Sequence, residues 1–192
     1  MTATSLEPVR AELRSLLEER ALRFGDFVLS SGRRSDFYCD ARVVTLDGRG
    51  LYLMSTLLLQ RCRELGATAI GGPTLAADPM LAGTAALSGA DGAGTPLKAF
   101  IVRKEAKSHG TGRTIEGPAL TADDRVVLVD DTLTTGGSLL AAHEQLRRET
   151  EATVLEVIVA IDREEGGAEA LASAGLRVTS LFRRRDFSGA AG

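Results

Sequence analysis

The sequence predicts an α/β fold with a doubly wound parallel sheet, and three observations carry this prediction. The chain has 192 residues, 44% hydrophobic and 26% charged, as in an ordinary globular domain. From residue 67 onward, short apolar segments alternate with segments of helical periodicity, the pattern of βαβ units. One apolar segment, Val126–Val129, runs directly into two carboxylates and a glycine-rich turn, as expected at the ligand-binding edge of such a sheet.

The N-terminal part is expected to hold a helix and two strands. Apolar residues recur at helical spacing over 8–21, and Pro8 suits a first helical turn. The segments 27–29 and 37–39 are apolar and aromatic, and the polar loop 30–35 separates them. These features predict an amphipathic helix followed by two strands joined by that loop.

A longer helix is expected next, over about 48–65. Asp47 is a suitable N-cap, and Gly66 a suitable C-terminal stop. The buried stripe of this helix is predicted to contain Leu51, Met54, Leu58, Cys62 and Leu65.

The remaining elements alternate along the chain. Asp78 and Pro79 are typical of a cap and first turn, and Gly175 ends the last predicted helix. Strands are predicted at 67–70, 98–102, 125–129, 154–161 and 176–182, and helices at 80–87, 138–148 and 168–174.

The overall charge and the cysteine content exclude several classes of protein. Lys and Arg total 23 against 26 Asp and Glu, a net charge of −3, so the broad basic surface of a dedicated nucleic-acid binder is not expected. Cys39 and Cys62 lack a metal-binding spacing and indicate a reducing compartment. No apolar run approaches the ~20 residues of a membrane span. We therefore expect a soluble cytoplasmic protein without nucleic-acid or membrane partners.

The segment from Asp130 to Ser138 is the strongest indication of chemistry. Two adjacent carboxylates repel each other, so they need hydroxyl donors or a cation nearby. Hydroxyls and glycines follow and lead into a helix, whose N-terminal amides suit a phosphate. A sugar phosphate satisfies both features. The alternatives are a capped turn with a solvated acidic pair, or a receiver-domain pair, although the pair lies late in the chain; no P-loop motif occurs.

A second segment, 103–113, concentrates positive charge in an otherwise acidic chain. It opens a connection of some twenty residues without clear periodicity, and long connections of this kind are usually lids or binding loops. Its glycines, Gly110 and Gly112, permit movement, so the segment is predicted to cover a polyanion. The alternative is a solvated run of charges. The cationic candidates are Arg103, Lys104, Lys107, His109 and Arg113.

Together these segments resemble the type I phosphoribosyltransferases and, among them, the orotate phosphoribosyltransferases. The acidic-pair loop is similar to the superfamily signature for 5-phosphoribosyl 1-diphosphate (PRPP), and 103–112 is similar to the mobile loop of the orotate enzymes. Residues 29–38 resemble the N-terminal substrate loop, and 161–163 resemble the base-binding strand end. The resemblance implies one domain over 1–192, with residues 1 to about 45 forming a small N-terminal hood.

The resemblance also implies roles for particular residues in transfer of the phosphoribosyl group from PRPP to N1 of orotate. Asp130 and Asp131 would bind the ribose hydroxyls beside a Mg²⁺ cofactor bridged by PRPP, with Asp78 as a further candidate near the metal. Lys104 would reach the diphosphate in its own subunit. The 5-phosphate would be held by Thr134, Thr135, Gly136, Gly137 and Ser138.

The same resemblance implies that the enzyme is a homodimer. Arg103, Lys107 and His109 would reach into the neighbouring subunit's site. The catalytic residues there would be Lys107 and His109 from one subunit and Lys104 and Asp131 from the other. The orotate subsite would comprise Arg163, which meets the carboxylate, together with Ser31, Phe37 and Tyr38.

Two departures from the family pattern leave other functions open. Many members have lysine at the position of Ser30 and a Tyr-Lys pair at Leu75-Ala76, so two cations are missing here. One alternative is a phosphoribosyltransferase for a purine or another pyrimidine, although an anionic base explains Arg163 better. Another is a non-catalytic regulator that senses PRPP, although no helix-turn-helix extension is visible.

Overall fold

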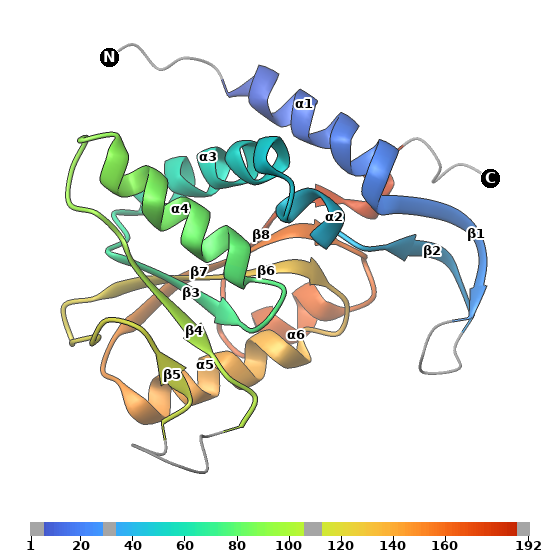
Figure 1. Cartoon of the computed structure of the whole chain (residues 1–192). Coiled ribbons are helices and arrows are strands. Elements are labelled where there is room, and N and C mark those ends of the chain that lie inside the picture. Colours follow the sequence, from blue (N-terminus) through green and yellow to red (C-terminus); the bar gives the residue numbers. More distant parts are fainter. Residues whose placement is uncertain (1–5, 29–33, 106–112, 188–192) are drawn as a thin grey trace.

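The computed structural model describes residues 6–28, 34–105 and 113–187. Its central sheet has six strands in the order β5-β4-β3-β6-β7-β8, all parallel except β5, which is antiparallel to β4 (Figure 1). This arrangement confirms the predicted doubly wound α/β class. The strands are β3 (Ala69–Pro73), β4 (Lys98–Val102), β5 (Ile115–Glu116), β6 (Arg125–Leu133), β7 (Thr153–Asp162) and β8 (Val178–Arg183).

Helices cover both faces of the sheet. Figure 1 shows α3 (Gly48–Leu65) and α4 (Asp78–Ala90) on one face, and α5 (Gly137–Glu149) and α6 (Gly167–Ser173) on the other. Because successive strand residues point to opposite faces, β6 contributes to both cores. Its side chains alternate between the two clusters, with Val127 and Val129 on the α3 side and Val126 and Leu128 on the α5 side. Sheet and helices thereby form three layers.

The N-terminal helix packs against α3, and the N-terminal hairpin lies beyond the carboxyl ends of the sheet strands (Figure 1). Helix α1 (Glu7–Leu16) continues into a π-helical turn, Leu17–Ala21, so the helix predicted over 8–21 is present with an irregular end. Strands β1 (Leu22–Val28) and β2 (Arg34–Cys39) form an antiparallel hairpin, and the short α2 (Arg42–Thr45) follows. We call the described elements up to Thr45 the hood. The hairpin begins earlier than expected because Leu22 and Phe24 also pack against the core.

Two sequence predictions about the sheet are wrong in extent. β3 runs to Pro73, three residues beyond the strand predicted over 67–70. Glycine is required there because a Cβ at Gly71 would overlap the Phe100 ring, and one at Gly72 would lie 2.2 Å from the Val129 carbonyl oxygen. The long connection after β4 also contains β5, whose Glu116 pairs with Ile101. The segment returns alongside the strand it left.

The sheet opens between β3 and β6, its topological switch point. β3 pairs with β6 only from Ala69 to Gly71, whereas β7 stays paired with β6 as far as Leu133. The last residues of β6 therefore lose their neighbour on one side. In open α/β sheets, ligands bind in this kind of crevice outside the carboxyl ends of the strands.

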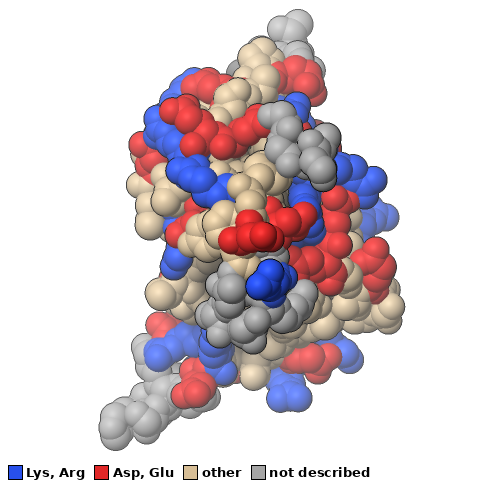
Figure 2. All heavy atoms as spheres, turned by 90° about the vertical axis from the view of Figure 1, so that its right-hand side faces the viewer, with Lys and Arg blue, Asp and Glu red and all other residues tan. Residues whose placement is uncertain are grey.

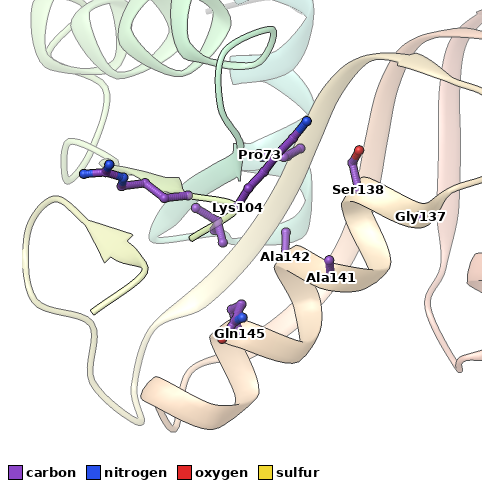
Figure 3. Close-up of a pocket in the computed structure, with 9 residues that line it drawn as sticks. Pro73, Lys104, Gly137, Ser138, Ala141, Ala142 and Gln145 are labelled. Atoms are coloured by element: carbon purple, nitrogen blue, oxygen red, sulfur yellow. The ribbon is translucent and has the colours of Figure 1, made fainter. Parts of the chain in front are cut away.

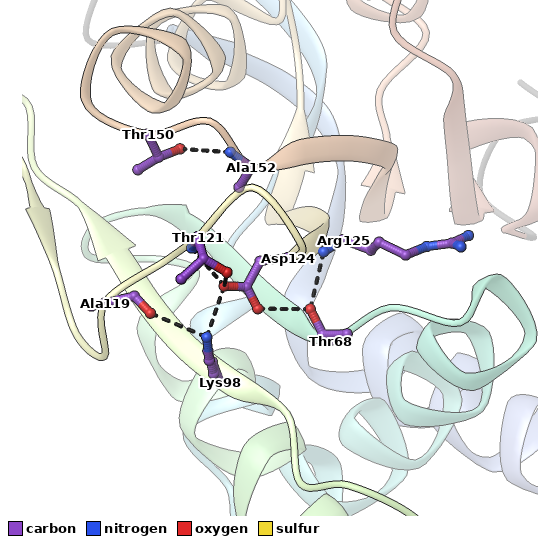
Figure 4. Close-up of polar contacts among 8 residues, drawn as sticks. All are labelled: Thr68, Lys98, Ala119, Thr121, Asp124, Arg125, Thr150 and Ala152. Carbon is purple, nitrogen blue, oxygen red and sulfur yellow. Dashed lines mark hydrogen bonds and ion pairs between the residues drawn. The ribbon is translucent and has the colours of Figure 1, made fainter.

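A polar network closes the opposite, amino-terminal edge of the sheet (Figure 4). Asp124, 4% exposed, accepts hydrogen bonds from Thr68 Oγ1 at 2.9 Å and Thr121 N at 2.8 Å, and it pairs with Lys98 Nζ at 2.7 Å. Despite its burial, these contacts lower the pKa of Asp124 to about 2. The network joins the starts of β3, β4 and β6, far from the crevice.

Replacing Asp124 by Asn should destabilise the fold by about 2 kcal/mol at pH 7, the free energy of a pKa shift of this size. The folded pKa lies below the ordinary 3.8, so this stability is present above pH 4 and is lost as the pH falls toward 2. Urea unfolding of wild type and variant at pH 7 and pH 3 measures this loss of stability. Asp123→Asn is the matched control, because Asp123 is the exposed neighbour of Asp124. Equal stability of the two variants at pH 7 would contradict the role of the network.

No helix in the described residues is long and apolar enough to cross a bilayer.

Candidate active site

The acidic pair lies at the crevice, within the end of β6. Asp130 and Asp131 are each 8% exposed. The backbone N–H of Asp131 donates to Asp130 Oδ1 at 3.0 Å, and Thr132 Oγ1 donates to Asp131 Oδ1 at 3.1 Å. The prediction that the pair follows the strand is wrong by a few residues, because pairing with β7 continues through Leu133. The sheet therefore fixes the backbone of both acids.

Burial and mutual repulsion disfavour the charged forms of the two acids. Burial, and then the charge of Asp131, raise the pKa of Asp130 to about 7, against the opposing effect of Lys104. Burial also raises the pKa of Asp131, while its hydrogen bonds to Thr132 and the charge of Arg42 oppose the shift. Hydroxyl donors or a cation would relieve this repulsion. The pair is therefore suited to a polyhydroxylated ligand.

The same carboxylates provide the test of fit for a Mg²⁺ ion. In the described part of the chain, no group of three or more His, Cys, Asp or Glu side chains is arranged to hold a metal. Mg²⁺ commonly binds through one or two carboxylates, with waters and substrate phosphates completing the shell. Asp130 and Asp131 supply that type of donor, so the residues fit an ion that arrives with a diphosphate.

A phosphate-sized cavity adjoins the acids. It measures about 60 Å³, and its wall runs from Thr132 to Leu139 with Asp130 at one side. Gly136, at φ +80°, is the N-cap of α5, and no side chain caps this helix. The N-terminal amides of a helix without a side-chain cap can donate to an anion, and the helix dipole favours negative charge there. The structure thus brings together the five predicted phosphate residues, 134–138.

A second cavity, of about 260 Å³, borders this phosphate cavity. The two share Gly137 and Ser138. Figure 3 shows Ser138, Ala142 and Gln145 along one side of α5, with Pro73 and Lys104 across from them. Lys104, the predicted diphosphate ligand, therefore lines the cavity next to the phosphate cavity.

The loop that carries the other predicted cations is anchored at both ends. Arg103 Nη1 pairs with Glu116 Oε1 at 2.8 Å within the same chain. On the returning side, Glu149 at the end of α5 accepts from Thr114 N at 2.9 Å and Thr114 Oγ1 at 2.6 Å. Lys107 and His109 lie outside the described residues. The anchors connect both ends of the loop to the sheet edge and to the helix that begins at the phosphate cavity.

The predicted base subsite lies at the end of β7. Arg163, 9% exposed, donates from its backbone to Leu133 O at 2.9 Å, and its Nη2 donates to Phe37 O at 3.3 Å. Phe37, 1% exposed, packs against Phe24 at 5.2 Å between ring centroids. Phe37 therefore supports Arg163 from the core, whereas Tyr38, 43% exposed, is the aromatic residue open to solvent. Ser31 lies outside the described residues.

The segment between β3 and α4 retains one unusual acid. Asp78 begins α4, and burial raises its pKa. Its Oδ1 is buried and has no hydrogen-bond partner in the described part of the chain. Leu75, which replaces one of the expected polar residues, is 78% exposed, so the segment presents an apolar side chain to solvent. Ser30 lies outside the described residues.

Sequence reasoning missed two acids that hold site residues. Glu149 anchors the cationic loop, and no local pattern distinguishes it from the other charges of α5. Glu165 pairs with Arg163. A sequence signal for Glu165 exists, because it lies directly before Gly166 and Gly167, in a turn at the carboxyl end of a strand where site residues are expected. The same reasoning had identified the Asp130–Asp131 pair.

Comparisons with known proteins agree with this geometry. Residues 84–175 match the model of the phosphoribosyl transferase domain. The orotate phosphoribosyltransferase of Thermosynechococcus vestitus is 44% identical over 95% of this chain and 94% of its own length. That of Corynebacterium glutamicum strain R is 43% identical over 92% of each chain.

Solved structures show the same fold. A crystal structure of Mycobacterium tuberculosis orotate phosphoribosyltransferase has a TM-score of 0.80 and 38% identity, covering 94% of this chain and 99% of that one. The same enzyme in complex with PRPP has a TM-score of 0.76 and 34% identity, over 93% and 98% of the two chains. The similarity in sequence and fold extends over nearly the whole length. The chain belongs to the orotate phosphoribosyltransferase family.

Proposed function

We propose that this chain transfers the 5-phosphoribosyl group from PRPP to N1 of orotate, giving orotidine 5-monophosphate and diphosphate in de novo pyrimidine biosynthesis. One observation carries the proposal: the buried acidic pair and the phosphate cavity adjoin on β6 and α5, and a buried arginine lies at the end of the neighbouring β7. The three features match the hydroxyls, the 5-phosphate and the carboxylate of the two substrates. Names and structures of close relatives support the same assignment.

The chain's residues act mainly by binding and electrostatics. The ribose hydroxyls donate to Asp130 and Asp131, which relieves the repulsion within the pair. The amides at the start of α5 hold the 5-phosphate, and Lys104 offsets negative charge that develops on the departing diphosphate. Because N1 of an anionic base is a weak nucleophile and diphosphate leaves readily, the transition state has oxocarbenium character. Fixed donors and charges then lower the barrier.

The proposed metal is Mg²⁺, held near Asp130 and Asp131 through the bound sugar diphosphate. When bound, it neutralises charge on the leaving group. Asp78 is a further candidate near this ion because its buried Oδ1 lacks a partner among the described residues.

We propose that the enzyme works as a homodimer in which Arg103, Lys107 and His109 reach the partner's site. To reach the partner's site, Arg103 would break its ion pair with Glu116. The free-energy cost is small, because the two side chains are 38% and 34% exposed. Exposed apolar side chains that such a dimer contact would cover are Val43, Leu46, Tyr52 and Leu75.

Replacing Lys107 by Ala should lower kcat roughly 100-fold, the usual effect of removing one transition-state donor. Co-expression with Asp131→Asn chains should then restore about a quarter of wild-type activity, because half of the randomly paired dimers contain one intact site. Differently tagged chains allow purified heterodimers to be assayed. Inactive heterodimers, or a monomer that turns over normally, would contradict sharing of the loop.

A spectrophotometric assay tests the proposed reaction. Orotate absorbance is followed with PRPP and Mg²⁺, with uracil and hypoxanthine as alternative bases. We expect turnover of orotate alone. Preference for either neutral base would assign the chain to another phosphoribosyltransferase activity, and tight PRPP binding without turnover would support a regulator.

We place the reaction in the cytoplasm, because Cys39 and Cys62 are free thiols. We also propose that residues 1–192 act as one domain, with residues up to about 45 contributing the hood.

A further inference from the structure

The turn that follows β7 has an unusual backbone conformation. Glu164 has φ +60°, the single non-glycine residue with positive φ in the described part of the chain. Its backbone N–H donates to Asp162 Oδ1 at 2.8 Å, which holds the turn closed. Side chains other than glycine rarely adopt this conformation, and where they do, the surrounding structure must hold it in place.

The turn brings Glu165 back to Arg163. Glu165 Oε1 lies 2.8 Å from Arg163 Nη2, the same nitrogen that donates to Phe37 O at 3.3 Å. The Arg163 side chain is 10% exposed and the Glu165 side chain 23%, so the ion pair is largely shielded from solvent. The Arg163 guanidinium also lies 5.6 Å from the centre of the Phe37 ring. A carboxylate, a carbonyl and an aromatic ring thus restrain one guanidinium.

The same turn is tied to the C-terminal end of the sheet and to the hood. Glu164 pairs with Arg185, which belongs to the short 3-10 helix after β8. Arg184 of that helix pairs with Asp36 and lies 5.5 Å from the centre of the Phe37 ring. Figure 2 shows basic and acidic side chains mixed on the side of the molecule that carries the hood. Glu164, Arg185, Arg184 and Asp36 therefore link the turn to β2.

We infer that Glu165 is a positioning residue that fixes the Arg163 guanidinium for the carboxylate of the base. This inference rests on the proposed function, in which Arg163 meets that carboxylate. An arginine side chain has many rotamers, and ordering it during binding costs affinity. Glu165 and Phe37 order it during folding, so the ligand meets a guanidinium already in place.

Glu165 also contributes to discrimination between bases. It holds the Arg163 guanidinium where the carboxylate of the base would meet it. A base with a carboxylate then forms hydrogen bonds in which both partners are charged, whereas a neutral base has no carboxylate to place there. Positioning of Arg163 therefore favours a base that carries a carboxylate.

Glu165→Gln tests the inference, because glutamine keeps the shape and removes the charge. We expect the KM for orotate to rise about tenfold, with the KM for PRPP within twofold of wild type. Preference for orotate over uracil in kcat/KM should fall by a similar factor. Glu169→Gln is the matched control, because Glu169 is exposed on nearby α6 and loses the same charge. Equal rises in both KM values, or the same effect in the control, would overturn the inference.

A double-mutant cycle with Arg163→Ala separates positioning from general stabilisation. If Glu165 acts through Arg163, then Glu165→Gln adds less than twofold to the orotate KM in the Arg163→Ala background. A full additional tenfold rise there would refute the inference and leave the proposed function intact. If wild-type enzyme does not turn over orotate, the proposed function fails and this inference fails with it.

Discussion

Asp131→Asn should lower kcat/KM for PRPP by about 100-fold or more while the chain remains fully folded. The amide has no charge and donates where the carboxylate accepts, so a ribose hydroxyl loses its partner in a buried site. Effects of about this size follow from removing one fixed polar group from a water-excluded site. Initial rates at varied PRPP and saturating orotate measure the loss.

The stability of the same variant gives an independent check. The charge of Asp131 raises the pKa of Asp130, so removing it relieves repulsion between two buried carboxylates. At pH 8 the melting temperature of Asp131→Asn should equal or exceed that of wild type. The exposed Asp123→Asn variant is the control and should match wild type in both rate and melting temperature. A catalytic defect accompanied by marked destabilisation would indicate that Asp131 serves the fold.

Arg163→Ala should raise the KM for orotate roughly 30- to 100-fold and leave the KM for PRPP within about threefold. The range corresponds to about 2–3 kcal/mol, the usual value of hydrogen bonds to a charged group. Alanine removes the proposed partner of the orotate carboxylate, whereas the acidic pair and the phosphate cavity remain. Steady-state kinetics with each substrate varied in turn separates the two effects.

Two further variants make this result specific. Arg163→Lys keeps the charge but loses the planar, two-nitrogen geometry, so it should recover only part of the orotate affinity. Arg177→Ala removes an exposed arginine just before β8 and should change neither KM. If Arg163→Ala weakens PRPP and orotate equally, Arg163 supports the whole crevice and does not select the base.

The alternation of strands and helices could be predicted because it depends on local pattern. The strands 98–102 and 154–161 and the helix 138–148 were confirmed within one or two residues. Asp130 and the predicted phosphate residues 134–138 line one cavity, because they lie within nine residues of sequence and one strand-to-helix turn positions them.

Predictions that needed the strand neighbours were less accurate. β3 continues past residue 70, where the prediction ended it, and includes Gly71 and Gly72, beside which Phe100 and Val129 occupy the space of a side chain. Glu156 lies within the apolar β7 and is 1% exposed, since Arg61 on α3 pairs with it at 2.8 Å. A partner 95 residues away in the chain has no local signature.

The sequence by itself determined the order of the elements, the acidic pair with its phosphate turn, and the group of cations on the connection after β4. Apolar periodicity, helix caps and contiguous motifs act over a few residues, and a linear pattern records them. Only the tertiary structure decided that Phe37 supports Arg163 from the core, that Glu165 pairs with that arginine, and that Glu149 anchors the cationic loop. These contacts depend on strand register and on a strained turn, both of which are fixed when distant segments pack together.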